Sequence, residues 1–304
     1  MALYKITENK IEAVKEQDFK LEKEIQKLIE VNLKSILNFE LVRSEFSLNN
    51  FRIDTLAFDR EAKCFVIIEY KRDKNFSVID QGYAYLSLML NNKADFILEY
   101  NENCKDLLKR EQVDWSQSKV IFISPAFTLY QKEAINFKDL PIELWEIKRY
   151  SNNTISFNKV QTSGAKESVK TISRKDATIE KVSTEIKVYT EQEHLEAGSE
   201  EIKELYERFK KAILELGELE LRPKKYYIGF IGSTNVVDLH IQKNALKFWI
   251  NLRIGELNDP KHLARDVSKV GHWGNGDYAI SINNDDELEY ILSLIKQSLK
   301  KNKK

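Results

Sequence analysis

Two acidic residues and a lysine stand near the ends of two adjoining segments, where they could act together on a phosphate. Asp54 lies in the segment 51–58, which mixes β-branched and aromatic residues. Glu69 and Lys71 follow the apolar run 65–68. Both segments have the composition of β-strands, and the short polar stretch between them predicts a turn. If the strands pair as a hairpin, Asp54 approaches Glu69 at the open end, and Lys71 shares the face of Glu69.

Two carboxylates beside an ammonium group suit a hard divalent cation. Oxygen ligands from Asp54 and Glu69 would hold Mg²⁺ or Mn²⁺ and leave positions open for a phosphate oxygen and a water. Lys71 would then orient or deprotonate that water, or neutralise charge that develops on the phosphorane. The alternative is a structural ion cluster, because surface ion pairs are common and contribute little to stability.

An amphipathic helix and a further strand are predicted before this hairpin. Apolar residues recur at three- and four-residue spacings over 21–37, which is the pattern of one helix face. The segment 41–48 has the composition of a first core strand, and Asn49-Asn50 after it favour a tight turn. These elements would support the strand that carries Asp54.

A second helix is predicted after the carboxylates, over 77–90, with Ser77 suited to cap its N-terminus. Gln81 and Tyr85 are four residues apart, so they share one face of that helix. Tyr85 is readily explained as a core aromatic, whereas a buried Gln81 amide would need hydrogen-bond partners. Later apolar segments predict further strands of a mixed sheet at 94–100, 120–124 and 142–147.

The pattern D…E-x-K formed by Asp54, Glu69 and Lys71 resembles the signature of the PD-(D/E)XK nuclease superfamily. About the first hundred residues, with LEKEIQKLIEVNL, RIDTLAFD, VIIEYKRDKN and IDQGYAYLSLML, are similar to bacterial members related to the mismatch-cleaving and RecB-like nucleases. The resemblance implies an α/β fold with a restriction-endonuclease-like mixed sheet flanked by helices. It also implies a Mg²⁺-dependent (or Mn²⁺-dependent) endonuclease that hydrolyses phosphodiester bonds. The expected substrate is DNA, in restriction, repair or phage defence.

The resemblance also implies roles for residues on the two helices. Glu22, in the pattern ExxIQxLI, would donate a third carboxylate to the metal, with Glu24 as the fallback and Glu30 less favoured by position. Gln81 and Tyr85 match the QxxxY helix that lines the catalytic cleft of RecB-like nucleases. The alternative for the three acids is a solvated helix surface.

A basic loop follows the second of the two strands. Arg72 and Lys74 lie where a phosphate backbone would pass in a nuclease. A charged loop of this kind is more often only solvated.

Composition limits the remaining possibilities. Lys and Arg together number 48, as do Asp and Glu, so the whole chain carries no net field that attracts nucleic acid. The two cysteines, Cys64 and Cys104, lack metal-ligand or disulfide spacing and favour a reducing compartment. No signal peptide opens the chain and no apolar run is long enough to span a bilayer, so a cytoplasmic protein without a membrane partner is expected. Cutting both strands of a duplex needs two sites, which would suit a homodimer, but the sequence does not decide the oligomeric state.

The length of 304 residues suggests two domains. We expect a nuclease-like domain over 1–159 and a smaller α+β domain over 189–304. Between them, 160–188 contains few large apolar residues and no aromatics, which is typical of a linker.

The C-terminal domain carries a strand pair whose two faces differ. Apolar residues alternate along 237–241 and 246–252, and the positions between them are mostly polar. On that second face Lys247, Trp249 and Arg253 could stack against or clamp a nucleic acid. Most such faces are only solvated.

The glycine-rich segment 271–278, GHWGNGDY, follows this strand pair. Its spacing is not that of a phosphate-binding loop, because no helix follows it directly. A tight loop held in place by an aromatic residue is the simpler interpretation, and a ligand site at His272-Trp273 is the alternative. The domain resembles a bacterial domain of unknown function often labelled "predicted transport protein", although the chain contains no membrane segment that would support transport.

Two functions therefore remain open. The first is the metal-dependent nuclease, which is favoured because every acidic and basic residue of the motif is present. The second is a noncatalytic module that binds nucleic acid or protein and retains a nuclease-like fold. The zero net charge favours weak or partner-dependent binding in this second case.

Overall fold

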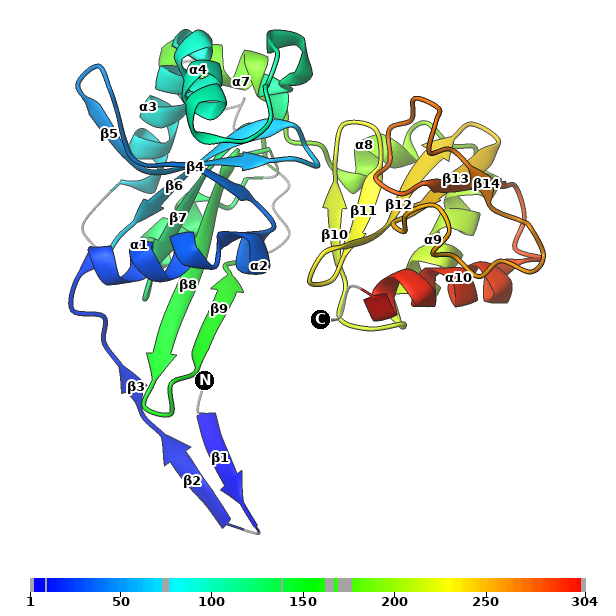
Figure 1. Ribbon diagram of the computed structural model, residues 1–304, viewed down its shortest axis with the longest axis horizontal. Coiled ribbons are helices and arrows are strands. Elements are labelled where there is room, and N and C mark those ends of the chain that lie inside the picture. Colours follow the sequence, from blue (N-terminus) through cyan, green and yellow to red (C-terminus); the bar gives the residue numbers. More distant parts are fainter. Residues whose placement is uncertain are drawn as a thin grey trace. The chain divides into compact units, whose positions relative to one another are not determined.

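The structure is a computed structural model, and it describes residues 3–8, 10–72, 77–137, 139–161, 167–168 and 177–301 (Figure 1). The chain divides into two compact units, Met1–Val188 and Tyr189–Lys304. Each unit has its own sheet and its own hydrophobic core.

The first unit is built around a mixed sheet in the order β3-β8-β7-β6-β5-β4, with β9 paired to β8. Strands β6, β7 and β8 run parallel to one another, and the remaining pairs are antiparallel. The strands are β3 (Glu16–Gln17), β4 (Glu40–Leu48), β5 (Phe51–Asp59), β6 (Cys64–Tyr70), β7 (Lys119–Ser124), β8 (Ile142–Tyr150) and β9 (Ile155–Lys159). A separate hairpin at the N-terminus pairs β1 (Leu3–Thr7) with β2 (Lys10–Val14).

Helices cover both faces of this sheet (Figure 1). One face packs against α1 (Glu22–Val31) and α2 (Leu33–Leu37). The other face packs against α3 (Val78–Asn91), α4 (Lys93–Asn103), α5 (Leu129–Ala134) and α7 (Ala177–Glu185). Two short 3₁₀ turns, η1 (Arg110–Gln112) and η2 (Trp115–Gln117), precede β7. The expected α/β class, with a mixed sheet between helices, is confirmed.

Burial on both faces explains the composition of the central strands. Every residue of β6 is buried, as its continuous apolar run predicts for a parallel strand covered on both sides. Cys64, at the start of that strand, is a core residue. On α3, a Cβ at Gly82 would lie 2.3 Å from Ile142 Cδ1, so this glycine lets the helix approach β8 closely.

Three segments differ from the sequence-based expectation. The segment 94–100 lies in the helix α4 instead of a strand, because Phe96 and Tyr100 are four residues apart and pack on one buried helix face. The helix expected over 21–37 is divided at Asn32 into α1 and α2. Part of the expected linker 160–188 forms α7, which packs against α3 with Val182 in the core.

The second unit contains an antiparallel sheet in the order β10-β11-β12-β13-β15-β14. Its strands are β10 (Glu220–Pro223), β11 (Ile228–Ile231), β12 (Asn235–Gln242), β13 (Ala245–Ile250), β14 (Arg265–Asp266) and β15 (Tyr278–Ile282). Its helices are α8 (Glu191–Leu195), α9 (Glu200–Leu214) and α10 (Leu288–Lys301). Helices α9 and α10 bury one face of the sheet, which confirms the smaller α+β unit. In the described part of the chain, no helix is both long and apolar enough to cross a membrane.

Candidate active site

The register of the β5–β6 hairpin places Asp54 opposite Glu69. Thr55 pairs with Ile68, so the two acids occupy the next facing positions at the open end of the hairpin. The backbone N–H of Asp54 donates to Glu69 Oε1 at 3.1 Å, and the backbone N–H of Tyr70 donates to Asp54 Oδ2 at 3.0 Å. Each carboxylate is therefore held by the backbone of the other strand.

Lys71 completes the group of charges. Its ammonium Nζ lies 3.4 Å from Glu69 Oε2. Its backbone N–H donates to the carbonyl oxygen of Ile123 in β7 at 2.9 Å, which anchors the residue just beyond the end of β6. Asp54, Glu69 and Lys71, predicted together from their spacing, are thus together in the structure.

The carboxyl groups of both acids have raised pKa values, chiefly because they are withdrawn from water. Glu69 is only 2% exposed, and its burial, together with the charge of Asp54, raises the pKa of its carboxyl group to about 7. Burial also raises the pKa of Asp54, and the positive charge of Lys71 lowers the pKa values of both acids without cancelling these shifts. A second cation beside the pair would favour the ionised form of both carboxylates.

Helix α3 adds the hydroxyl of Tyr85 to this end of the sheet. The Tyr85 hydroxyl interacts with the Glu69 carboxylate, which lowers the pKa of Glu69, and it lies 3.4 Å from the carbonyl oxygen of Arg52. Gln81 lies one helical turn before Tyr85, and its amide oxygen is buried with no hydrogen-bond partner among the described residues. A buried amide without a partner is unusual in a pure core position.

The three acids of α1 have different partners. Glu22 Oε1 accepts a hydrogen bond from the backbone N–H of Arg72 at 2.8 Å, and the charge of Glu22 contributes to the raised pKa of Asp54. Glu24 instead forms an ion pair with Arg149 at 3.6 Å. Glu30 accepts a hydrogen bond from Thr55 Oγ1 at 2.5 Å.

The expected three-carboxylate metal set is not assembled. In the described ranges, no three side chains of His, Cys, Asp or Glu are grouped so that they could hold one metal ion. Glu22 is near enough to influence the pKa of Asp54, but its carboxylate accepts a hydrogen bond from the backbone N–H of Arg72. The side chains that could hold a cation are therefore the pair Asp54 and Glu69.

The structure also contains a polar network beside Asp54 and Glu69, which the sequence analysis did not predict. The buried Gln26 amide donates to Glu30 Oε1, Ser44 Oγ and the carbonyl oxygen of Asp54, at 3.0, 3.2 and 2.9 Å. The signal in the sequence was a glutamine on the edge of an apolar helical stripe, where a buried amide needs partners. Glu45, on β4, also raises the pKa of Asp54, and nothing in its local sequence pattern indicates this.

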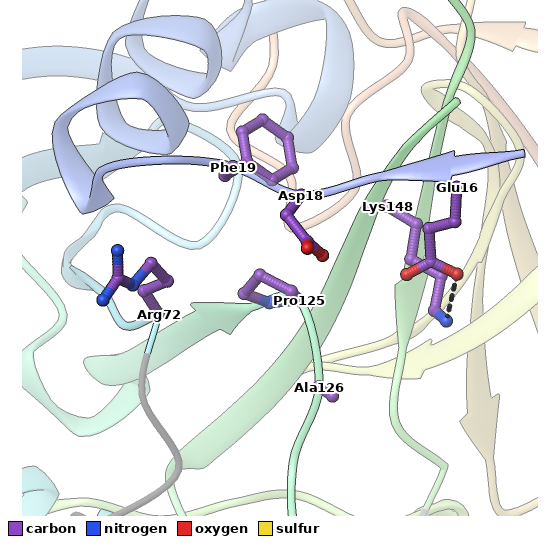
Figure 2. A pocket seen from close by; sticks show the side chains of 7 residues that line it. All are labelled: Glu16, Asp18, Phe19, Arg72, Pro125, Ala126 and Lys148. Carbon is purple, nitrogen blue, oxygen red and sulfur yellow. Dashed lines mark hydrogen bonds and ion pairs between the residues drawn. The ribbon is translucent and has the colours of Figure 1, made fainter. Parts of the chain in front are cut away.

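Arg72 lines a pocket of about 430 Å³ beyond the ends of β6 and β7 (Figure 2). Its guanidinium group donates to the carbonyl oxygen of Lys20 at 2.6 Å. Figure 2 shows Arg72 and Lys148 on opposite sides of Pro125, with Lys148 paired to Glu16 at 2.9 Å. Glu16 and Asp18 balance the two cations of the lining, so the pocket is not a basic channel. Lys74, predicted with Arg72 to contact a phosphate backbone, lies outside the described residues.

The three residues expected to contact nucleic acid in the second unit differ in exposure. Trp249 is 1% exposed, because the segment 271–277 covers its ring, so it does not offer an open stacking surface. Lys247 lies with Nζ 4.9 Å from the centroid of the Trp249 ring. Arg253 is exposed, and its backbone N–H donates to Glu256 Oε2 at 2.7 Å. The expected clamp is therefore wrong at Trp249.

One relative matches this chain along nearly its whole length, and a family model matches its C-terminal part. It is 52% identical over 301 residues to an uncharacterized protein of Haemophilus influenzae, covering 99% of this chain and 100% of that protein. Residues 191–302 match a family model described as "Domain of unknown function (DUF5655)".

Two solved structures share a lower similarity with part of the chain. One is a repair endonuclease from Pyrococcus abyssi, with 19% identity, a TM-score of 0.23, and 40% of this chain and 45% of that chain covered. The other is an EndoMS–dsDNA2 complex, with 18% identity, a TM-score of 0.27, and 43% and 47% covered. The chain thus matches just under half of each structure, at scores too low to establish a common fold.

Proposed function

We propose that this chain, which belongs to the same family as the Haemophilus influenzae protein, is a divalent-metal-dependent nuclease that hydrolyses phosphodiester bonds of DNA. The relative has no described function, so the proposal is based on residues of this chain. The single observation that carries it is the pair formed by the half-buried Asp54 and the buried Glu69, with Lys71 as the neighbouring cation.

The donor set of this pair fits Mg²⁺ or Mn²⁺. Asp54 Oδ1 accepts no hydrogen bond from any described residue, so one oxygen of that carboxylate is available. Mg²⁺ in proteins is commonly bound through one or two carboxylates, with substrate phosphates and waters completing the shell. The raised pKa values of both acids are the electrostatic signature of a site that gains stability from an added cation.

Each residue has a distinct role in this proposal. Asp54 and Glu69 would hold a divalent cation, which when bound would supply Lewis acidity toward a phosphate oxygen. Lys71 orients the attacking water or stabilises the charge that develops on the phosphorane. Tyr85 and the backbone N–H of Asp54 hold the Glu69 carboxylate in position. The side-chain NH₂ group of Gln81 would donate to the substrate, either directly or through a bridging water.

Cleavage assays with matched variants test this function. Purified protein is incubated with single- and double-stranded DNA and with RNA, with and without Mg²⁺ or Mn²⁺. We expect metal-dependent cleavage of DNA that falls by about 100-fold or more in Asp54→Asn and Lys71→Ala. Asp95→Asn and Lys27→Ala, which change exposed residues of the same unit, should cleave like the wild type. Wild-type protein that cleaves none of these substrates with either metal would overturn the proposal.

A second readout does not depend on activity. Mn²⁺ at about 100 times its Kd should stabilise the wild type by about 2.7 kcal/mol in thermal unfolding. Asp54→Asn and Glu69→Gln should lose this stabilisation, because each removes a carboxylate ligand. An equal stabilisation of both variants would place the cation elsewhere.

A noncatalytic binding module is the second candidate. The observation that favours it is that no group of three metal-binding side chains is present among the described residues. Its signature is DNA binding without cleavage, unchanged in Asp54→Asn and Lys71→Ala.

A further inference from the structure

The two faces of the sheet in the second unit are covered differently, and among the described residues the core cluster on one face (Tyr227, Trp249, Val267 and Ala279) includes no helix residue. Side chains alternate along β12 and β13, and Leu239 and Phe248 point into the core beneath α9 and α10. His240, Lys247 and Trp249 lie on the opposite face. The glycine-rich loop crosses this face, with the N–H of Asn275 donating to the buried Asp238 at 2.7 Å.

A pocket of about 310 Å³ opens between this face and the loop. Aromatic and imidazole rings form most of its walls, with one lysine and no carboxylate in the lining. The lining residues are His240, Gln242, Lys247, Trp249, Gly271, His272 and Trp273.

The rim of the pocket holds an exposed aromatic residue in a fixed orientation. Trp273 is 53% exposed and stacks on Tyr226, with ring centroids 4.9 Å apart and planes at 14°. His240 packs edge-on against Trp273 at 5.0 Å. Tyr226 and His240 thus hold the Trp273 ring, about half of which stays exposed, and an exposed aromatic ring can receive a second planar ring by stacking.

The polar groups of the pocket favour an anion with hydrogen-bonding edges. Lys247 supplies the positive charge of the lining. His240 Nδ1 must donate to the carbonyl oxygen of Tyr226, 2.7 Å away, because that oxygen can only accept. His240 Nε2 is then left as an acceptor.

Two ring nitrogens of the lining lack partners. Trp249 Nε1 and His272 Nδ1 are buried, and neither has a hydrogen-bond partner among the described residues. Unpaired buried nitrogens are rare because each forfeits the hydrogen bonds it makes in water. Trp249 and His272 both line the pocket, but the two nitrogens lie behind its walls, so they do not themselves contact an occupant.

We infer that this pocket binds one nucleotide unit, with its base stacked against Trp273 and its phosphate at Lys247. An apolar ligand would offer no polar partner to the Lys247 ammonium or to the acceptor His240 Nε2. A phosphate alone would make no use of the exposed aromatic rim. A nucleotide supplies a planar ring, hydrogen-bonding edges and a negative charge together. The occupant is either a free nucleotide or one nucleotide of a single strand, since both present this chemistry.

Isothermal titration calorimetry on the full-length protein tests this pocket. EDTA in the buffer removes divalent metal, so metal-dependent binding at Asp54 and Glu69 does not contribute to the signal. The common nucleoside 5′-monophosphates are titrated singly, followed by the matching nucleosides, ribose 5-phosphate and a single strand of about 12 nucleotides. We expect Trp273→Ala to weaken nucleotide binding by about tenfold or more, the range found when a stacking aromatic is removed. Lys247→Gln should weaken binding of the monophosphates and leave binding of the nucleosides unchanged.

Two exposed residues provide matched controls. Tyr130→Ala removes an aromatic ring that is 88% exposed in the first unit, and Lys211→Gln removes an exposed cation of α9. Both should bind nucleotides like the wild type. An unchanged melting temperature of Trp273→Ala would show that its loss of binding does not come from unfolding.

The outcomes separate the two sources of the ligand. A single strand that binds about tenfold tighter than any monophosphate indicates recognition of nucleic acid, and equal affinities indicate a free nucleotide. The inference is overturned if no monophosphate or single strand saturates the protein, if ribose 5-phosphate binds as tightly as the nucleotides, or if both pocket variants bind like the wild type. Because Asp54→Asn leaves this pocket intact, loss of cleavage and loss of nucleotide binding are distinguishable.

Discussion

Glu69 is a buried acid at the end of a strand that is covered on both faces. Its carboxylate is fixed by the backbone N–H of Asp54 and approached by Lys71 and Tyr85. These contacts favour the charged form, but burial and the charge of Asp54 outweigh them and raise the pKa to about 7. An ionised Glu69 at this position therefore lowers the free energy of unfolding. Acids with perturbed pKa values of this kind are concentrated at functional sites.

The raised pKa predicts how stability depends on pH. Below the unfolded pKa of Glu69, about 4.5, the acid is protonated in both states and imposes no penalty. As pH rises from there to about 7, the unfolded chain releases the proton while the folded chain retains it, so the free energy of unfolding falls. Above the folded pKa the loss is complete and remains constant, at up to about 3 kcal/mol.

Glu69→Gln tests this, because the neutral amide keeps the shape and removes the titration. Urea unfolding without divalent metal should show that the variant gains stability relative to the wild type as pH rises from about 5 to 7, with no further gain above about 8. Glu204→Gln, an exposed acid of α9, serves as the control and should show a pH dependence like the wild type. A constant difference between Glu69→Gln and the wild type across this range would contradict the raised pKa.

At the scale of elements, the loop 271–277 depends on glycine where it crosses β13. A Cβ at Gly276 would lie 1.7 Å from the carbonyl oxygen of Ile250, and one at Gly274 would lie 2.4 Å from the Trp249 ring. A backbone oxygen cannot move aside as a side chain can. The simpler interpretation of the GHWGNGDY segment, a tight loop held by an aromatic residue, therefore agrees with its packing, and the same packing covers Trp249.

Gly276→Ala should accordingly destabilise the second unit by about 3 kcal/mol or more, because the added methyl group meets the backbone of β13. Gly271→Ala is the matched control in the same loop, since its Cβ would meet nothing within 4 Å. Thermal unfolding followed by circular dichroism measures both variants. Equal melting temperatures for Gly276→Ala and the wild type would show that the loop does not approach β13 in this way.

Helix α7 changes the extent of the first unit. Val182 and Ile186 lie in the same core as α3 and α4, and the Lys93 ammonium pairs with Glu185 at 2.6 Å. Part of the segment expected to be a linker therefore contributes to the core. Its few apolar residues were too sparse to predict this from composition.

At the scale of the whole molecule, the two units have separate cores. The core residues of the first unit all precede 189, and those of the second all follow it. Each unit also completes its own sheet. Two separate cores predict two units that can fold alone.

Fragments of the chain test this division. The fragments 1–188 and 189–304 should each unfold cooperatively. A fragment 1–160 should be less stable than 1–188 by about 2 kcal/mol or more, since it loses the buried side chains of α7. Urea unfolding of the purified fragments measures the difference. Equal stability of the two N-terminal fragments would mean that α7 contributes nothing to the first unit.

The sequence by itself determined the features that depend on local geometry. The facing positions of Asp54 and Glu69 follow from a hairpin whose register a short turn sets, and strand alternation adds Lys71. The shared face of Gln81 and Tyr85 follows from helical periodicity. These relations join residues that are near one another along the chain, so spacing is sufficient to predict them.

Only the tertiary structure decided the features that depend on which distant segment covers a surface. The Gln26 amide reaches the strand that carries Asp54, Trp249 is buried by a later loop, and α7 packs on α3. Spacing shows which face of an element a side chain occupies, but burial and hydrogen bonding depend on the segment that packs against that face. That is also why the pocket of the second unit, formed by two strands and a loop that lies later in the chain, becomes visible only in the folded chain.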